Sequence, residues 1–268
     1  MTANPVDYSA AKTVIAFAER CGKHGAEVGH FQLGIDDPLK AERIAGFLKA
    51  GAPLTWPNPI VGPVYGETSA KRALDIIKVS YGPAVIEKHF PWRFTGYQHS
   101  LLETLPFTES FLESIAFTHG IVAKHPSASV MGIKKGMPKK APNNLWYPED
   151  WYHDKAQEFA HEGPGNGWGI IRLDEAPDSW DKDYPTSLEC LSPIEIPALC
   201  CEGTLFAEVH CLETEQRIFT KRWIRFRDRT ASGYRVYARF SSGGWSVNYW
   251  CVDDACPDLG LASALRTS

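Results

Sequence analysis

The chain has 268 residues, of which 44% are hydrophobic and 12% aromatic, and its formal net charge is −4. This composition supports a large buried core and excludes an intrinsically disordered chain, which requires low hydrophobicity and high net charge. Lys and Arg number 28 against 32 Asp and Glu, so the whole molecule is not a polycation and any basic surface must be local.

The first twenty residues lack a basic segment followed by a continuous apolar stretch, which argues against an export signal. No apolar run approaches the roughly 18 residues that a membrane helix requires. The seven cysteines are therefore expected to be reduced and mostly buried. We expect a cytoplasmic protein of bacterial type that does not contact a membrane.

The first third of the chain is predicted to be helical. Apolar residues recur at the three- and four-residue spacing of one helix face. The pattern predicts helices over residues 8–21, 37–51, 68–82 and 106–115. Thr68 and Thr108 are the predicted N-caps of the last two helices, because a threonine side chain accepts hydrogen bonds from free backbone N–H groups. Four prolines between residues 51 and 66 predict a loop.

From about residue 115 the pattern changes to short apolar segments between turn residues, which indicates strands. The predicted elements are a buried strand at 115–123, a polar loop at 134–144, a helix at 148–163 and a strand at 167–173. An acidic, proline-containing connection follows at 174–185. Residues 197–215 have a helical stripe and are predicted as a helix, with a strand over 204–211 as the alternative.

Three strand-like segments follow at 218–228, 232–240 and 243–252. The dipeptides Ser232-Gly233 and Gly243-Gly244 stand between these segments, where hairpin turns need glycine. Residues 259–266 are predicted as an edge strand. The fold class expected is α+β, with a helical portion at 1–114 and a mainly antiparallel sheet domain packed by helices at 115–268; one continuous globule is the alternative.

The C-terminal half also carries an ordered set of short motifs. These are WYPEDWY, QEFA, GWGIIR, RIFTKRWIRFRD, GYRVYARF, GGWSVNYW and LGLASALR. In this order they resemble a group of uncharacterised proteins from uncultured bacteria, from about residue 102 to the C-terminus. In that group the stretch that matches 198–213 looks helical. The resemblance supports the fold and implies no activity, ligand or catalytic residue.

Basic and aromatic side chains alternate along the predicted strands between residues 217 and 239, where eight Lys or Arg stand against one acid. A period of two turns Ile224, Phe226, Val236 and Phe240 inward and leaves the arginine row in solvent. The predicted binding residues of the outer face are Lys221, Trp223, Arg225, Arg227, Arg235, Tyr237, Arg239 and Trp250. Rings among cations are typical of surfaces that bind single-stranded nucleic acid.

Two observations favour a simpler interpretation of this face. Arginine stacks on aromatic rings in ordinary solvated sheets, where the contact serves stability. Residues 174–215 hold eleven Asp or Glu and a single Lys, so an acidic segment of the same chain can cover the basic sheet. The sequence contains no RNP-type motif, KH loop or zinc knuckle.

No local motif for metal binding or catalysis is present. His153 and His161 are two helical turns apart, too far to share one ion, and the cysteines include no CxxC pair. A cluster of Cys200, Cys211, Cys251 and Cys256 assembled by folding is left open. There is no GxSxG, Walker or dinucleotide-binding loop.

We therefore expect a non-enzymatic module that binds a macromolecule, most readily a protein, and that needs no cofactor or metal. The first alternative is a nucleic-acid-binding protein that uses the basic aromatic face. The second is a hydrolase whose site is assembled from scattered His and acidic residues, since active sites need not leave local motifs.

Overall fold

The computed structural model describes residues 63–138, 150–251 and 254–266. The chain divides into two compact units, Met1–Pro59 and Ile60–Ser268, and the described residues belong to the second. The helices predicted over 8–21 and 37–51 lie outside the described residues. Within them the α+β class is confirmed, because helices alternate with mainly antiparallel strands.

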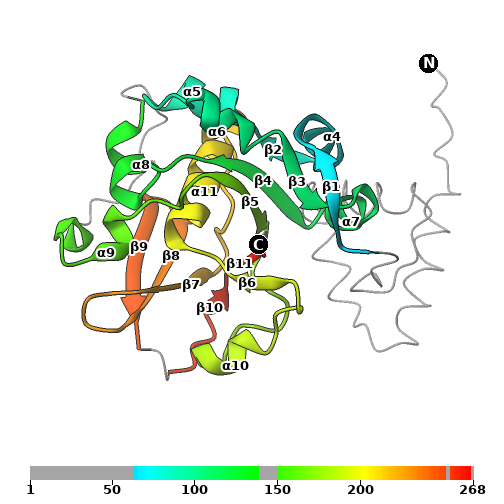
Figure 1. The fold of residues 1–268 in the computed structure, drawn as a ribbon. Coiled ribbons are helices and arrows are strands. Elements are labelled where there is room, and N and C mark those ends of the chain that lie inside the picture. The colour runs from blue at the N-terminus through cyan, green and yellow to red at the C-terminus, as the bar shows by residue number, and fades with distance from the viewer. Residues whose placement is uncertain (1–62, 139–149, 252–253, 267–268) are drawn as a thin grey trace, which may run out of the picture. The chain divides into compact units, whose positions relative to one another are not determined.

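The strands of the described residues form three sheets (Figure 1). The smallest pairs β1 (Tyr65–Ser69) with β3 (Thr104–Phe107). The five-stranded sheet has the order β2 (Val79–Tyr81), β4 (His119–Lys124), β5 (Gly167–Arg172), β11 (Ser263–Leu265) and β6 (Glu195–Pro197). The four-stranded sheet has the order β10 (Leu259–Leu261), β7 (Trp223–Arg229), β8 (Arg235–Ser241) and β9 (Gly244–Trp250).

Most helices are short and lie at the periphery. They are α4 (Ala70–Ile76), α5 (Pro83–His89), α6 (Gly96–Ser100), α7 (Glu109–Ile115), α8 (Val130–Gly136), the 3-10 turn η1 (Trp151–His153), α9 (Glu158–His161) and α10 (Tyr184–Leu188). Helix α7 is capped by Thr108, as predicted. None of the described helices has the length and apolar character needed to cross a bilayer.

The long helix α11 (Cys200–Thr214) lies between the two larger sheets (Figure 1). The helix predicted over 197–215 is thereby confirmed. Residues 200–211 are all buried, including the polar side chains of Glu202, Glu208 and His210, because the helix is covered on all sides. Glycine permits the closest contacts: a Cβ on Gly203 would lie 2.4 Å from the ring of Phe226, and one on Gly120 would lie 2.1 Å from Phe206.

One hydrophobic core joins elements from both ends of the described chain. Phe107, from β3, and Phe206, from α11, belong to the same cluster of buried residues. The four side chains expected to face inward from the C-terminal strands are confirmed there, since at most 2% of any of them is exposed: Ile224, Phe226, Val236 and Phe240.

Two predicted helices are shorter than expected. The one predicted over 68–82 ends at Ile76, because Ile77 adopts an extended conformation and Val79–Tyr81 pair in parallel with β4; Ser69 rather than Thr68 is its cap. The one predicted over 148–163 breaks at Asp154. There the carboxylate of Asp154 accepts a hydrogen bond from the N–H of Ala156 at 3.0 Å. This bond competes with the backbone hydrogen bonds that would continue the helix.

Three other predictions also need correction. Lys134 and Lys135, expected in a polar loop, belong to α8, which Ser129 caps by accepting from the N–H of Gly132 at 2.9 Å. The strand expected from residue 115 begins at His119, because α7 continues to Ile115. The terminal segment makes two strands: β10 is an edge strand as predicted, but β11 lies inside the five-stranded sheet.

Candidate functional site

The outer face of the four-stranded sheet brings together most of the predicted binding residues. Cross-strand pairing places Arg225 opposite Tyr237 and Arg235 opposite Trp250. Ile224 pairs with Ala238, and the residues next to this pair, Trp223 and Arg239, also lie together. The guanidinium of Arg239 is 4.4 Å from the ring centroid of Trp223. The alternation of cations and rings predicted for this face is therefore present in the strand register.

Rings and guanidinium groups on this face contact one another closely. The rings of Trp223 and Tyr237 meet edge to face at 4.8 Å. Arg235 lies 3.8 Å above the ring of Tyr184, which comes from α10. Such contacts are worth about 0.5–2 kcal/mol each, depending on how far the pair is desolvated. They use much of the cation and ring surface for contacts within the chain.

The acidic connection covers part of the same face. Residues 174–191, which we name the cover, include Glu175, whose Oε1 lies 2.6 Å from Nη1 of Arg222. Trp180 lies under the guanidinium of that arginine, at 4.5 Å. Arg225 donates to the carbonyl oxygen of Lys182 and, at 2.9 Å, to the hydroxyl of Ser187. An acidic segment of the chain thus covers the basic sheet, as its composition allowed.

Arg225 is the main departure from the predicted surface. It was expected in solvent, but none of it is exposed, because the cover lies over it. Burial lowers its pKa, and the neighbouring Cys256 and Asp183 act in the opposite direction. Within the described residues its Nε and Nη1 atoms have no hydrogen-bond partner. A buried guanidinium without a carboxylate is destabilising, because its charge has left water without full compensation.

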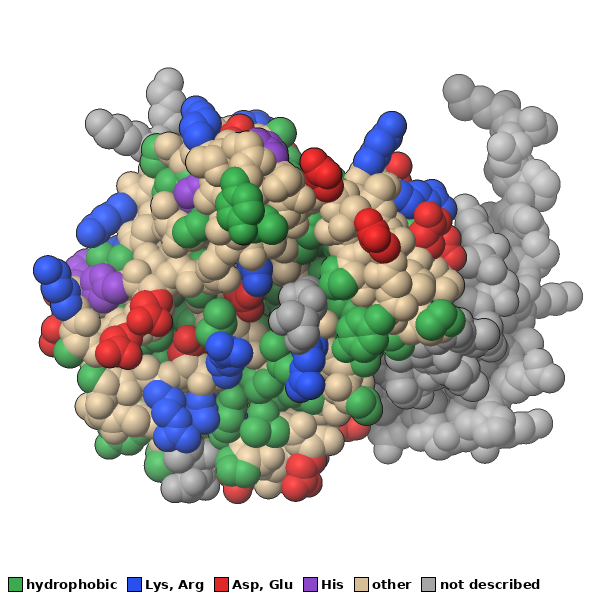
Figure 2. All heavy atoms as spheres, in the orientation of Figure 1, with side chains coloured by type: hydrophobic (Ala, Val, Ile, Leu, Met, Phe, Trp, Pro, Cys, Tyr) green, Lys and Arg blue, Asp and Glu red, His purple; other side chains and the backbone are tan. Residues whose placement is uncertain are grey.

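The far end of the sheet is uncovered. Tyr234, Tyr249 and Trp250 are 42%, 41% and 44% exposed, and Arg227 and Arg229 beside them are exposed as well. We name these five residues the aromatic end. Figure 2 shows blue Lys and Arg side chains among green hydrophobic ones in this part of the molecule. Of the predicted binding residues, Arg227 and Trp250 belong to it.

The tyrosines of the aromatic end were not predicted as binding residues. They share the strand parity of the core-facing side chains but lie beyond the core: Tyr234 directly precedes β8, and Tyr249 is the penultimate residue of β9. Their rings stack at 5.5 Å, and that of Tyr249 meets Trp151 at 4.8 Å. Trp151 in turn donates to the carbonyl oxygen of Val247 at 3.0 Å, which occupies part of the β9 edge. Their position at strand ends was the available signal in the sequence.

Of the remaining predicted residues, Arg235 is next to the aromatic end, because it pairs with Trp250, and the others lie farther along the strands. Lys221 is exposed in the segment before β7, at the other end of that strand. Trp223 and Arg239 are half-buried, and Tyr237 is buried. The structure therefore divides the predicted surface into a covered part around Arg225 and an open part around Trp250.

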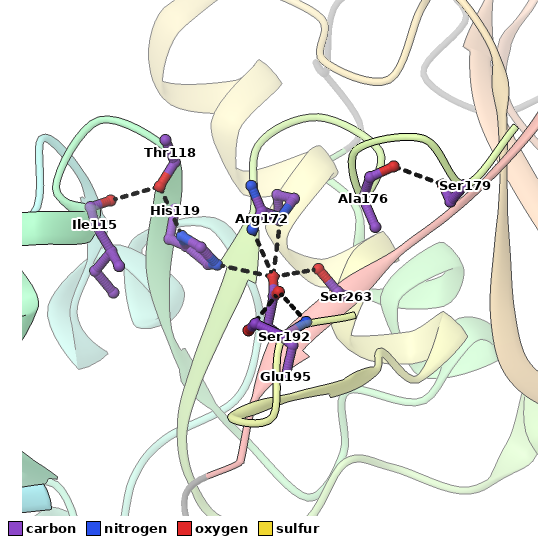
Figure 3. Close-up of polar contacts among 9 residues, drawn as sticks. All are labelled: Ile115, Thr118, His119, Arg172, Ala176, Ser179, Ser192, Glu195 and Ser263. Carbon is purple, nitrogen blue, oxygen red and sulfur yellow. Dashed lines mark hydrogen bonds and ion pairs between the residues drawn. The ribbon is translucent and has the colours of Figure 1, made fainter. Parts of the chain in front are cut away.

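A second polar cluster lies in the five-stranded sheet and centres on Glu195 (Figure 3). Both Nε and Nη2 of Arg172 lie within 2.9 Å of its Oε1, to which the hydroxyl of Ser263 also donates at 2.9 Å. The backbone and hydroxyl of Ser192 donate to Oε2 at 3.2 and 2.8 Å. His119 completes the cluster, with Nε2 3.4 Å from Oε1. We name these residues the Glu195 cluster.

This cluster is saturated with donors. Burial raises the pKa of Glu195, but the contact with His119, the charge of Arg172 and the hydroxyl of Ser192 outweigh it and hold the pKa well below its usual range. Burial lowers the pKa of His119, which favours its neutral form. Both serine hydroxyls donate to the carboxylate, so neither is oriented for activation by His119. The arrangement joins strands β4, β5, β6 and β11.

Local spacing gave no sign of the Glu195 cluster, because its members come from four strands and a turn. Within the described ranges, no group of three or more His, Cys, Asp or Glu is placed to hold a metal ion. Cys200, Cys201 and Cys211 are buried in α11, and burial raises the pKa of each thiol.

Comparison of the chain with protein-family models, with curated proteins and with solved structures finds no match.

Proposed function

We propose that this protein is a non-enzymatic interaction module that binds a protein partner through the aromatic end of its four-stranded sheet. The observation that supports the proposal is the exposure of Tyr234, Tyr249 and Trp250 beside Arg227 and Arg229. Tyr, Trp and Arg are the residue types most enriched in the energetic centres of protein interfaces. Their rings supply large contact areas at a low cost in side-chain entropy.

The distribution of charge favours a protein over a nucleic acid. A single strand of nucleic acid needs a continuous basic track along its backbone. Here Arg222 is paired with Glu175 and Arg225 is buried, which interrupts such a track. The N–H of Ala231, in the β7–β8 turn, donates to Gln157 at 3.0 Å. This contact brings the segment that carries Asp154 and Glu158 close to the turn beside the aromatic end.

Nucleic acid is the second candidate, and the alternation of Arg239, Trp223 and Tyr237 on one face is the observation that favours it. It predicts binding to single-stranded RNA or DNA that weakens steeply with salt. Replacing Arg227 and Arg229 by Ala should then weaken binding and reduce the salt dependence.

The proposal is tested by placing a photo-cross-linking residue at position 250 of the full chain in its native cells. The matched control carries the same residue at position 97, because Tyr97 is 71% exposed and lies in α6. We expect a discrete protein adduct from position 250 alone. It should disappear when Arg227 and Arg229 are both replaced by Glu.

The trapped protein is then purified and its affinity measured. Trp250→Ala should weaken binding at least ten-fold, as expected for an aromatic residue at an interface centre, whereas Tyr97→Ala should not change it. Equal adducts from both positions, or an affinity that Trp250→Ala leaves unchanged, would contradict the proposal. An adduct that nuclease removes would favour the second candidate.

A further inference from the structure

The covered part of the outer face is already occupied by a peptide segment of defined chemistry. The cover presents acids and rings in the order Glu175, Trp180, Asp183 and Tyr184. Arg222 contacts the first two of these residues, and Arg235 stacks on Tyr184. The sheet therefore holds an acidic, aromatic segment through its arginines.

The cover does not fully satisfy the face beneath it. Nε and Nη1 of Arg225, which is wholly buried, have no acceptor among the described residues. The Nε atoms of Arg235 and Arg239, on the same face, are also buried without one. An occupant that offers a carboxylate at these positions would form charge-assisted hydrogen bonds that the cover leaves unmade.

The attachment of the cover is separate from the main core. Its apolar residues Ala176 and Tyr184 pack with Leu261 and Leu191 in a small cluster of their own. Asp178 and Asp181 have φ values of 59° and 54°, in the left-handed region that L residues seldom adopt. Displacing the cover would relieve these backbone conformations. It would also break the small cluster and a few hydrogen bonds to the sheet, among them those of Leu261 with Ala176 and Ser179.

We propose that the face formed by Arg222, Arg225 and Arg235 is a binding site for an acidic, aromatic peptide segment of a partner, for which the cover is the built-in competitor. This inference rests on the proposed interaction function and extends it from the aromatic end to the covered face. Charge complementarity defines the occupant: carboxylates facing arginines, with a ring between them. Binding of such a segment displaces the cover.

A synthetic peptide with the sequence of residues 174–191, carrying Cys190→Ser, is the probe. It is added to the full-length protein and to a variant with Glu175→Gln and Trp180→Ala, which loosens the cover and leaves its small apolar cluster intact. Fluorescence anisotropy should show at least ten-fold tighter binding to the variant. Adding Arg225→Ala should remove that gain, and a peptide with Trp180→Ala and Tyr184→Ala should not bind.

Hydrogen exchange of the unmodified protein is the second measurement. Amides of the cover should exchange faster than those of α11 if the cover opens. A folded variant, with unchanged near-UV circular dichroism, that binds the peptide no better than the unmodified protein would overturn the inference. So would a cover that exchanges as slowly as α11. Trp250→Ala should not affect peptide binding, so failure of the aromatic end as an interface would be seen separately.

Discussion

The Glu195 cluster and the surroundings of Arg225 solve the same problem, a charge removed from water, in opposite ways. Glu195 receives donors from Arg172, Ser192 and Ser263, and its carboxylate is satisfied on both oxygens. Arg225 lies under a segment rich in acids, yet its bonds go to a backbone carbonyl and a hydroxyl. The carboxylate of Glu195 is thus satisfied within the chain, although Nε2 of His119 beside it makes no hydrogen bond among the described residues, whereas the guanidinium of Arg225 lacks acceptors.

This difference separates structural polar groups from groups available to a ligand. A buried charge whose partners are all present stabilises one packing of the strands around it and has no capacity left for another molecule. A buried charge that lacks acceptors gains from any ligand that supplies them. The comparison therefore supports the proposal that this protein binds a partner through the four-stranded sheet.

The largest effect is expected in the Glu195 cluster. Replacing Glu195 by Gln leaves the largely buried guanidinium of Arg172 without its partner charge, which should lower the free energy of unfolding by about 3–5 kcal/mol. Urea denaturation at pH 7 measures it. Glu189→Gln, at an exposed position, is the control and should change the value by less than about 0.5 kcal/mol. Equal effects of the two substitutions would contradict a structural role for the cluster.

Glu208 in α11 is an unsatisfied carboxyl of the core. Neither of its oxygens has a hydrogen-bond partner in the part of the chain that the structure describes, and burial raises its pKa well above the usual range, against the charge of Arg217. The unfolded chain releases this proton at lower pH than the folded chain, so stability falls as pH rises above the unfolded pKa. Glu208→Met should stabilise by about 1–3 kcal/mol at pH 8 and by less at pH 4. A gain that does not depend on pH would refute this.

Asp228, on β7, provides a second test by pH, in which the expected change in stability is smaller. Burial raises its pKa to about 6, although the N–H of Cys200 donates to it at 2.6 Å. Its contribution makes stability fall between about pH 4 and pH 6, because the unfolded carboxyl ionises first. Asp228→Asn should flatten this part of the stability curve. In contrast, the lowered pKa of Glu195 makes stability fall as the solution becomes more acidic. Unfolding curves at one-unit pH intervals distinguish the two slopes.

The smallest effect on stability is expected at Arg225. Replacing it by Met removes a charge that has no carboxylate partner and fills the same space, so the free energy of unfolding should change by about 1 kcal/mol or less. Arg172→Met is the matched variant in the Glu195 cluster. It should lower the free energy of unfolding several times more, because it leaves the buried carboxylate of Glu195 without its partner charge. If both variants lose the same stability, the proposed contrast between the two regions is wrong.

Local patterns predicted which face of the C-terminal strands is buried, but they did not predict what covers the opposite face. The period of two in β7 and β8 predicted which side chains of the four-stranded sheet face the core, and those of Ile224 and Val236 do. Whether Arg225 meets water depends on a segment 38 residues away, as its bond to Ser187 shows. The acidic composition of that segment was the only sign of the contact.

The Glu195 cluster could not be predicted from local sequence patterns. Its residues stand at the positions 119, 172, 192, 195 and 263, without regular spacing, and only the strand order β4-β5-β11-β6 makes them neighbours. Strand order depends on long-range packing against α11, which no local pattern encodes. The break at Asp154 was missed for a simpler reason, since an aspartate that bonds to the backbone two residues on looks like any exposed helical residue in sequence.

Hydrogen exchange of the protein alone and with its trapped partner bound compares the two regions in one experiment. Added protection is predicted in the segments that contain Tyr234 and Trp250, and none in those that contain His119 and Glu195. Protection confined to the second pair of segments, with the sheet end unchanged, would contradict the assignment of binding to the four-stranded sheet.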